Sequence, residues 1–141
     1  MRKEIEKLLQ SVQKPARYAG GELNSVMKDK SKVALRYAFC FPDTYEIGMS
    51  HLGMKILYGV ANAREDTWCE RVFAPADDME ALMRANGEPL FALESGDPIK
   101  DFDMIGFTMQ YELSYTNILN MLDLAGVPLR AVDRKSLTPI V

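Results

Sequence analysis

The chain has 141 residues, of which 48% are hydrophobic and 26% charged, as is typical of one globular domain with a substantial core. Its formal net charge of −3 argues against a large nucleic-acid-binding surface, which requires a basic face. No apolar run is long enough to span a bilayer, and the N-terminus lacks the apolar region of a signal peptide. We therefore expect a cytoplasmic protein without a membrane segment.

The N-terminal part of the chain is expected to differ from the rest. Apolar residues recur at helical spacing within residues 1–14, and Pro15 ends the pattern. Residues 15–31 are irregular, with a glycine turn and a run of charges. We therefore predict a helix and an irregular arm in residues 1–31, and the main domain in residues 32–141.

The main domain opens with a strand followed by a helix. Residues 33–41 alternate between large apolar residues on one face and mostly small residues on the other, which predicts a strand covered on both sides. A helix is expected from about Ser50 to Ala63. Its predicted buried stripe consists of Leu52, Ile56, Leu57 and Val60.

Strands and helices continue to alternate after this helix. A second strand is predicted at residues 68–73, and a helix follows from Pro75 to Asn86, with an acidic first turn and Gly87 at its end. Residues 90–93 form a possible minor strand. We expect a short central strand at residues 104–108.

The last predicted helix spans residues 113–125, with Gly126 and Pro128 after it. Its predicted buried side consists of Ile118, Met121, Leu122 and Ala125. Residues 128–132 are expected to be a short strand or an extended arm. Residues 138–141 read as the opening of another buried strand, so we expect a domain that is cut short or belongs to a longer polypeptide.

This alternation predicts an α/β domain of Rossmann-like type, flavodoxin-like or cobalamin-binding-like, with a mainly parallel sheet and helices on both faces. The two cysteines, Cys40 and Cys69, lie in strand-like segments, so we expect buried reduced thiols. Two cysteines alone are too few for a metal site, and we predict none.

The segment after the first strand is the strongest candidate for a binding site. Ligands of open α/β sheets bind where strands end and helices begin. Here the segment carries Asp43, Tyr45, Glu46, Gly48 and Ser50. A tight loop without a ligand is the alternative interpretation.

His51 is the only histidine in the chain and falls near the start of the predicted helix. It could serve as a ligand, although a structural role is favoured.

A second polar segment follows the strand at residues 104–108. It contains Gln110, Tyr111, Glu112 and Ser114. If the two strands are neighbours, Asp43, Tyr45 and Gly48 form one rim of a crevice and Gln110, Tyr111 and Ser114 the other. The alternative is that Ser114 or Glu112 caps the helix and the tyrosines cover the sheet edge.

The first segment, Asp43-x-Tyr45-x-x-Gly48, resembles the Asp-x-His-x-x-Gly motif of cobalamin-binding Rossmann-like domains. In that family the histidine ligates cobalt and the aspartate orients it. Tyr45 replaces the histidine here, and a neutral phenol is a poor cobalt ligand. The sequence therefore predicts that any bound cobalamin lacks a protein imidazole below the cobalt.

More of the chain resembles the N-terminal region of a family of radical S-adenosylmethionine proteins with a cobalamin-binding-like N-terminal domain. The similar stretches lie at residues 17–26, 41–53, 70–75, 78–80, 93–95 and 110–117. The resemblance implies a larger enzyme in which a C-terminal radical S-adenosylmethionine barrel carries the [4Fe–4S] cluster and S-adenosylmethionine.

We therefore expect an accessory domain, not catalytic by itself, that serves such an enzyme as a cobalamin-type cofactor or substrate module. Its expected partner is the barrel of the same polypeptide. The cofactor-binding residues implied are Asp43, Tyr45, Glu46, Gly48, Ser50, His51, Gln110, Tyr111, Glu112 and Ser114. The alternative is a flavodoxin-like structural or interaction module with no cofactor of its own.

Overall fold

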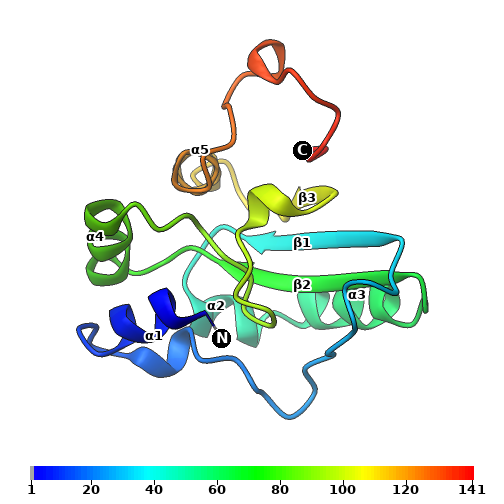
Figure 1. Ribbon diagram of the computed structural model, residues 1–141, viewed down its shortest axis with the longest axis horizontal. Helices are drawn as coiled ribbons and strands as arrows, with labels where there is room; N and C mark the ends of the chain where they lie inside the picture. The colour runs from blue at the N-terminus through cyan, green and yellow to red at the C-terminus, as the bar shows by residue number, and fades with distance from the viewer. Residues whose placement is uncertain (1) are drawn as a thin grey trace.

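A computed structural model describes residues 2–141 (Figure 1). It is an α/β domain built on a three-stranded parallel sheet with the order β2-β1-β3. The strands are β1 (Leu35–Phe41), β2 (Thr67–Phe73) and β3 (Met104–Phe107). The α-helices are α1 (Lys3–Leu9), α2 (Tyr45–Ser50), α3 (Leu52–Asn62), α4 (Asp77–Asn86) and α5 (Ser114–Leu124).

Three 3₁₀ turns complete the elements: η1 (Pro15–Arg17), η2 (Ile99–Asp101) and η3 (Ala131–Asp133). The predicted α/β class and parallel sheet are confirmed. After β2, the chain crosses back over β1 to place β3 on the other side, which is the strand order of flavodoxin-like sheets.

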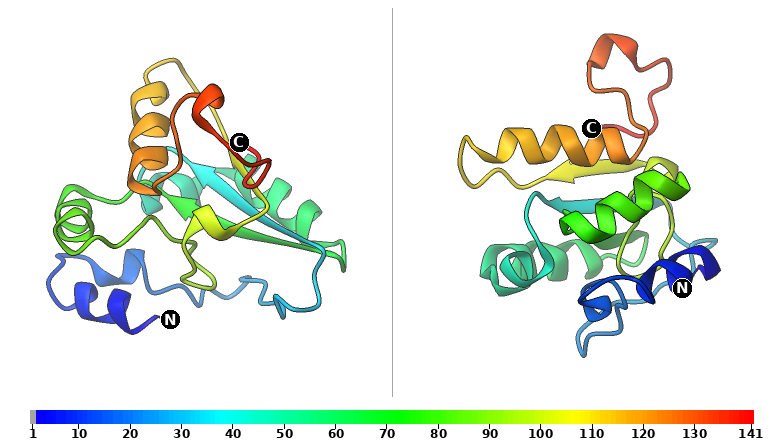
Figure 2. Two further views of the ribbon diagram at one scale, coloured as in Figure 1. Left: turned by 45° about the horizontal axis from the view of Figure 1, so that its top comes forward. Right: turned by 90° about the vertical axis from the view of Figure 1, so that its left-hand side faces the viewer.

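Two apolar cores lie on opposite faces of the sheet. On one face, Ala38 and Cys40 of β1 pack with residues of α1, α4 and α5. On the other, Phe39 and Phe41 of β1 pack with α3. In the right-hand view of Figure 2, α5 and α3 accordingly lie on opposite sides of the strands. The strict alternation of β1 thus supplies both cores, as its sequence pattern indicates.

The two cysteines end up in different cores. Cys40 faces the core that contains α4 and α5, whereas Cys69 faces the core that contains α3, and both are free and buried. Burial raises the pKa of both thiols, that of Cys69 to about 12. The prediction that both cysteines are buried is confirmed.

The helix predicted from about Ser50 to Ala63 is present as α3, but its predicted buried face is wrong and the separate helix α2 before it was not predicted. Helix begins already at Tyr45, and a break at His51 separates α2 from α3. The buried residues of α3 are Met54 and Tyr58, whereas the predicted stripe is 55–68% exposed: Leu52, Ile56, Leu57 and Val60. A helix that is apolar on nearly every side has no dominant stripe from which its buried face can be read.

Other boundaries also differ from the prediction. The strand expected to be central, β3, lies at the edge of the three-stranded sheet, and β1 is the central strand. Residues 90–93 contribute only an isolated bridge between Phe91 and Pro98. The short strand or extended arm predicted at residues 128–132 contains no strand, and residues 131–133 form η3. The N-terminal helix ends at Leu9, and Ile140 forms a single parallel bridge to Met104 of β3.

Hydrogen bonds join the N-terminal arm to both α3 and β2. Val26 donates its N–H to the Tyr58 hydroxyl and accepts a bond from the Trp68 indole, at 2.7 and 2.9 Å. The ammonium of Lys28 donates to carbonyls at the end of α3, including that of Asn62 at 2.9 Å. The boundary between the arm (residues 1–31) and the main domain (residues 32–141) stays a prediction.

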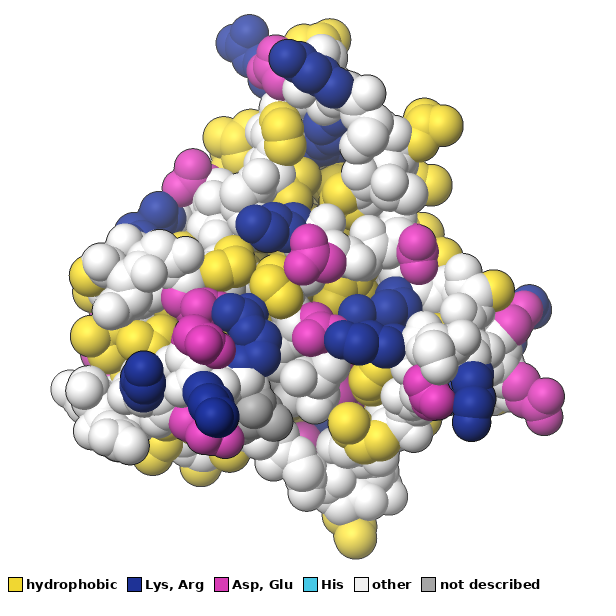
Figure 3. Space-filling view, viewed as in Figure 1, with side chains coloured by type: hydrophobic (Ala, Val, Ile, Leu, Met, Phe, Trp, Pro, Cys, Tyr) yellow, Lys and Arg dark blue, Asp and Glu magenta, His cyan; other side chains and the backbone are white. Residues whose placement is uncertain are grey.

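On the face shown in Figure 3, charged side chains lie mostly in mixed groups of adjoining blue and magenta atoms. The ion pairs of the protein include those of Arg84 with Glu80 and with Asp123, each at 2.9 Å. Within residues 2–141, no helix is both long enough and apolar enough to cross a bilayer.

Candidate functional site

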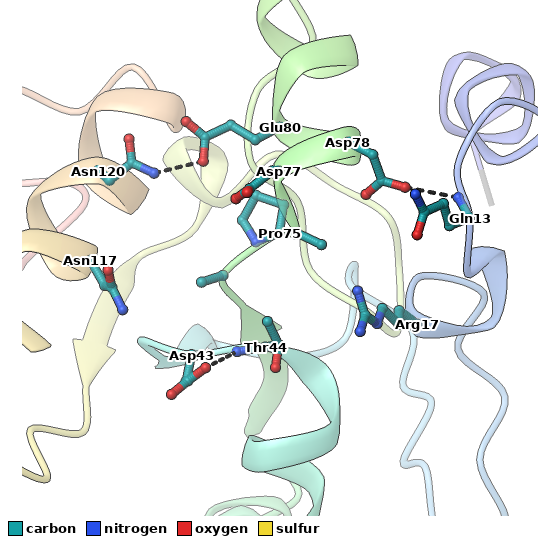
Figure 4. Close-up of a pocket in the computed structure, with 12 residues that line it drawn as sticks. Gln13, Arg17, Asp43, Thr44, Pro75, Asp77, Asp78, Glu80, Asn117 and Asn120 are labelled. Carbon is teal, nitrogen blue, oxygen red and sulfur yellow. Dashed lines mark hydrogen bonds between the residues drawn. The ribbon is translucent and has the colours of Figure 1, made fainter.

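A polar cavity of about 570 Å³ lies at the carboxyl ends of β1 and β2 (Figure 4). We call it the carboxyl-edge cavity. It is bounded by the segments after β1 and β2, the first turn of α4, one side of α5, and the chain around η1. Its lining residues are Gln13, Arg17, Asp43, Thr44, Ala74, Pro75, Ala76, Asp77, Asp78, Glu80, Asn117 and Asn120.

Asp43 reaches the cavity because β1 ends at Phe41 and the chain turns there into α2. Its carboxylate accepts the N–H of Thr44 at 2.7 Å, and its carbonyl accepts the N–H of Ala74 at 3.0 Å. The second bond joins the segments that follow β1 and β2. Across the cavity, the Asn117 amide of α5 donates to the Pro42 carbonyl at 2.8 Å.

The first turn of α4 supplies three carboxylates to the cavity. Asp78 accepts the N–H of Gln13 at 2.8 Å, and this bond is the main reason that the pKa of Asp78 is lowered. Glu80 accepts a bond from the Asn120 amide at 2.8 Å. Asp77 makes no side-chain hydrogen bond within residues 2–141. Negative charge is favourable at this position, because the N-terminus of a helix carries a partial positive charge.

The cavity is therefore negatively charged. It contains four carboxylates, and the guanidinium of Arg17 is its only cation. Arg17 is itself paired with Glu46 at 2.9 Å, and that hydrogen bond raises the pKa of Arg17. Such an arrangement disfavours phosphates and other anions and favours ligands that donate hydrogen bonds.

The carboxylates do not form a metal centre. Among residues 2–141, no group of three or more His, Cys, Asp or Glu side chains is arranged to hold a metal ion.

The predicted residues of the first segment point in different directions. Asp43 alone among them lines the cavity. The Tyr45 hydroxyl donates to Glu22 at 3.0 Å, and its ring packs against Phe73. Burial is the main cause that raises the pKa of Tyr45. Because α2 begins at Tyr45, the prediction of a loop through Gly48 is wrong.

The remaining predicted residues of α2 serve local contacts. Gly48 is buried against Phe73, and Glu46 pairs with Arg17 at the surface. The Ser50 hydroxyl donates to the Ile47 carbonyl at 2.7 Å.

His51 begins the next helix. Its Nδ1 accepts the N–H of Met54 at 3.2 Å, so the imidazole caps α3. Its ring also lies 5.3 Å from that of Phe41.

The second predicted segment lies at the carboxyl end of β3, the neighbour of β1. Gln110, Tyr111 and Glu112 are exposed and do not line the carboxyl-edge cavity. Ser114 is buried in the first turn of α5, and Leu113 occupies the cap position without a side-chain bond. The capping role considered for Ser114 or Glu112 is thus not observed. The binding roles of these residues stay predictions.

The sequence analysis missed most of the cavity, notably Asp77, Asp78, Glu80 and Asn120. A signal for them was present. The acidic cluster follows the end of the second predicted strand, and the rule that points to Asp43 applies equally there.

Comparison with protein families adds an independent finding. Residues 53–141 match the family of N-terminal regions of radical S-adenosylmethionine (SAM) proteins, which covers α3 through the last described residue. The chain belongs to this family. No curated protein and no solved structure is similar enough to count as a match.

The stretches that resemble the N-terminal region of radical SAM proteins can be located in the structure. Three of them meet at Arg71, which contacts Glu22 of the arm and Glu94 of the segment after α4. Burial favours a higher pKa for Glu22, but hydrogen bonds from its own N–H and from Ser25 and the charge of Arg71 outweigh burial. The pKa of Glu22 is therefore lowered overall. The contacts of Arg71 therefore hold the arm to the sheet.

The residues present do not fit a cobalamin held through a protein imidazole. His51 uses Nδ1 to cap α3, Tyr45 is bonded to Glu22, and neither lines the carboxyl-edge cavity. The two cysteines lie on opposite faces of the sheet, so they cannot share one iron–sulfur cluster.

Proposed function

We propose that this domain is the substrate-recognising module of a radical SAM protein, and that the carboxyl-edge cavity binds a group that donates hydrogen bonds. One observation carries the proposal: Asp43, Asp77, Asp78 and Glu80 surround a cavity of about 570 Å³ together with the carboxamides of Gln13, Asn117 and Asn120. A cavity of this size accommodates a small molecule or one end of a larger substrate.

The chemistry of the lining favours ammonium, amide or hydroxyl groups. Carboxylates accept hydrogen bonds only, while the carboxamides both donate and accept. Asp77 is the best-placed acceptor, because its oxygens have no partner within residues 2–141. Of the two roles expected from the resemblance, these groups favour a substrate module over a cobalamin module.

The experiment follows backbone amide shifts by ¹H–¹⁵N NMR while the domain is titrated with 1,4-diaminobutane, inorganic phosphate and hydroxocobalamin in separate series. We expect the diamine to shift amides of the first turn of α4 and of Asn117, with little effect of phosphate. Asp77→Asn should weaken diamine binding several-fold, since it removes a charge without changing the size of the side chain. Asp133→Asn, on the exposed η3 turn, is the matched control.

Two outcomes would contradict the proposal. One is binding of phosphate in place of the diamine at these amides. The other is stoichiometric binding of hydroxocobalamin that is lost in His51→Ala, since that result would make the domain a cofactor module.

A second candidate role, an interaction module, is favoured by α3. Four apolar residues of this helix are more than half exposed: Leu52, Ile56, Leu57 and Val60. Apolar patches of this kind mark contacts between proteins or domains. Substitution of all four residues by Glu, tested for release of a co-expressed barrel domain, distinguishes this role from ligand binding at the cavity.

A further inference from the structure

A second cavity is separate from the carboxyl-edge cavity. We call it the arm groove, because the N-terminal arm forms one wall and helices α2 and α3 form the other. It has a volume of about 410 Å³ and shares no lining residue with the carboxyl-edge cavity. Its lining residues are Glu22, Leu23, Asn24, Val26, Gly48, Met49, Met54, Lys55, Tyr58, Gly59 and Arg71.

The walls of the arm groove are mainly apolar. Met49 and Met54 supply flexible thioether side chains, which adapt to ligands of different shape. Val26 and Tyr58 are joined by the 2.7 Å bond from the Val26 N–H to the Tyr58 hydroxyl, which fixes the arm against α3. The bonds from the Tyr45 hydroxyl to Glu22 and from Lys28 to the Asn62 carbonyl also join the arm to these helices, so the two walls are held together at several points.

One buried cation lines the groove without a full set of partners. The side chain of Arg71 is 8% exposed, and its Nε donates to Glu94 at 2.6 Å while Nη2 donates to Glu22 at 2.9 Å. Its Nη1 meets only the sulfur of Met49, at 3.1 Å. A thioether is a weak acceptor, so this nitrogen can still donate to a stronger one.

A second cation lies nearby at the surface. Lys55 also lines the groove and forms no ion pair within residues 2–141. The two carboxylates of the groove region are already engaged, because Glu94 accepts from Arg71 and Glu22 accepts from Arg71, Ser25 and Tyr45. The groups left to interact with a ligand are therefore cationic donors and apolar walls.

We propose that the arm groove binds an apolar chain that ends in a carboxylate. The carboxylate lies between Nη1 of Arg71 and the ammonium of Lys55, and the apolar chain lies along Met49, Met54 and Tyr58. A charge-assisted bond to Arg71 replaces its weak contact with sulfur, which is the energetic reason for the orientation. The ligand chemistry differs from that of the carboxyl-edge cavity, where four carboxylates face one cation, because Arg71 and Lys55 balance Glu22 and Glu94 at the arm groove.

Gly59 makes a direct test possible. A Cβ added at this position meets nothing within 4 Å, and Gly59 lines the groove. Gly59→Leu therefore adds a bulky side chain at the edge of the groove without a clash at its Cβ, and removal of a helix glycine should not lower the melting temperature. Val60→Leu, on the exposed neighbouring position of α3, is the matched control.

The test titrates the full chain with octanoate and follows the methionine methyl signals by NMR. We expect octanoate to shift Met49 and Met54, Gly59→Leu to weaken binding at least tenfold, and Val60→Leu to leave it unchanged. Lys55→Gln should weaken octanoate several-fold but leave 1-octanol unaffected. Acetyl-leucyl-leucine, titrated in parallel, separates a peptide C-terminus from a free acid as the source of the carboxylate.

The proposal is overturned if octanoate fails to shift these methyl groups, or if Gly59→Leu binds it as the unmodified chain does. Equal binding of 1-octanol and octanoate would also overturn it, because the two cations would then contribute nothing.

Discussion

Nε of Arg71 donates a 2.6 Å hydrogen bond to Glu94, whose side chain has no exposed surface, and the backbone N–H of Arg71 donates to the other oxygen of the same carboxylate at 2.7 Å. One carboxylate thus binds both the side chain and the main chain of a β2 residue. This contact attaches the segment after α4 to the outer edge of the sheet, next to the bond from the Leu93 N–H to the Arg71 carbonyl.

Removal of Arg71 alone, with Glu94 left in place, should destabilise the fold strongly. Arg71→Met leaves the charge of Glu94 buried without its cation, and we expect a loss of about 3–5 kcal/mol in the free energy of unfolding, measured with urea. The double variant Arg71→Met with Glu94→Leu should recover part of that loss. Arg64→Met removes an exposed ion pair with Asp66 and should cost about 0–1 kcal/mol as a control. Equal losses for Arg71→Met and Arg64→Met would contradict the structural role of the buried pair.

The cap at His51 predicts a distinction between two substitutions. His51→Ala removes the acceptor of the Met54 N–H and should lower the free energy of unfolding by about 0.5–2 kcal/mol. His51→Asn restores an acceptor that is favoured at this position and should recover most of the loss. Thermal unfolding followed by circular dichroism measures both. If asparagine were as destabilising as alanine, the cap would not be the reason for the effect.

Two helix glycines should respond in opposite directions to the same substitution. A Cβ at Gly48 would overlap with the Phe73 ring and lie 3.2 Å from Cδ1 of Phe41, so Gly48→Ala should destabilise by about 1–3 kcal/mol. At Gly59 the space is open, and Gly59→Ala should stabilise by up to about 1 kcal/mol through helix propensity. Urea unfolding of both variants tests the pair. A stabilised Gly48→Ala variant would show that α2 does not pack on β2 in this way.

The pH dependence of stability should include a contribution from Asp97. Burial alone raises its pKa, but the hydrogen bond from Lys30 and the charge of Arg36 lower it overall, and both cations lie within 3.0 Å. Because the pKa is lower in the folded state, this contribution is present above the unfolded pKa of about 3.9 and is lost as the pH falls through the folded value.

Urea midpoints measured between neutral pH and the acid limit should therefore fall less steeply in Asp97→Asn than in the unmodified chain. Asp133→Asn, on the exposed η3 turn, should keep the steeper dependence. An unchanged slope in Asp97→Asn would mean that its ion pairs do not stabilise the folded state.

Local sequence patterns were sufficient to predict the α/β class, the three strands and helices α4 and α5. The alternation of residues 33–41 and the capping residues around α4 and α5 act over a few positions, and these short-range preferences survive in the structure. The burial of both cysteines follows from the same strand patterns. The order β2-β1-β3 does not, because it depends on pairing between segments that are far apart in the chain.

The tertiary structure alone decided which polar residues meet. Asp43 and Asn117 are 74 positions apart and line one cavity, while Tyr45, two positions after Asp43, points to Glu22 instead. The break at His51 sets the rotation of α3, so that Met54 is buried and Leu52 is exposed. A one-dimensional pattern contains neither the direction of a helix relative to the sheet nor the approach of the arm, and these two features create both cavities.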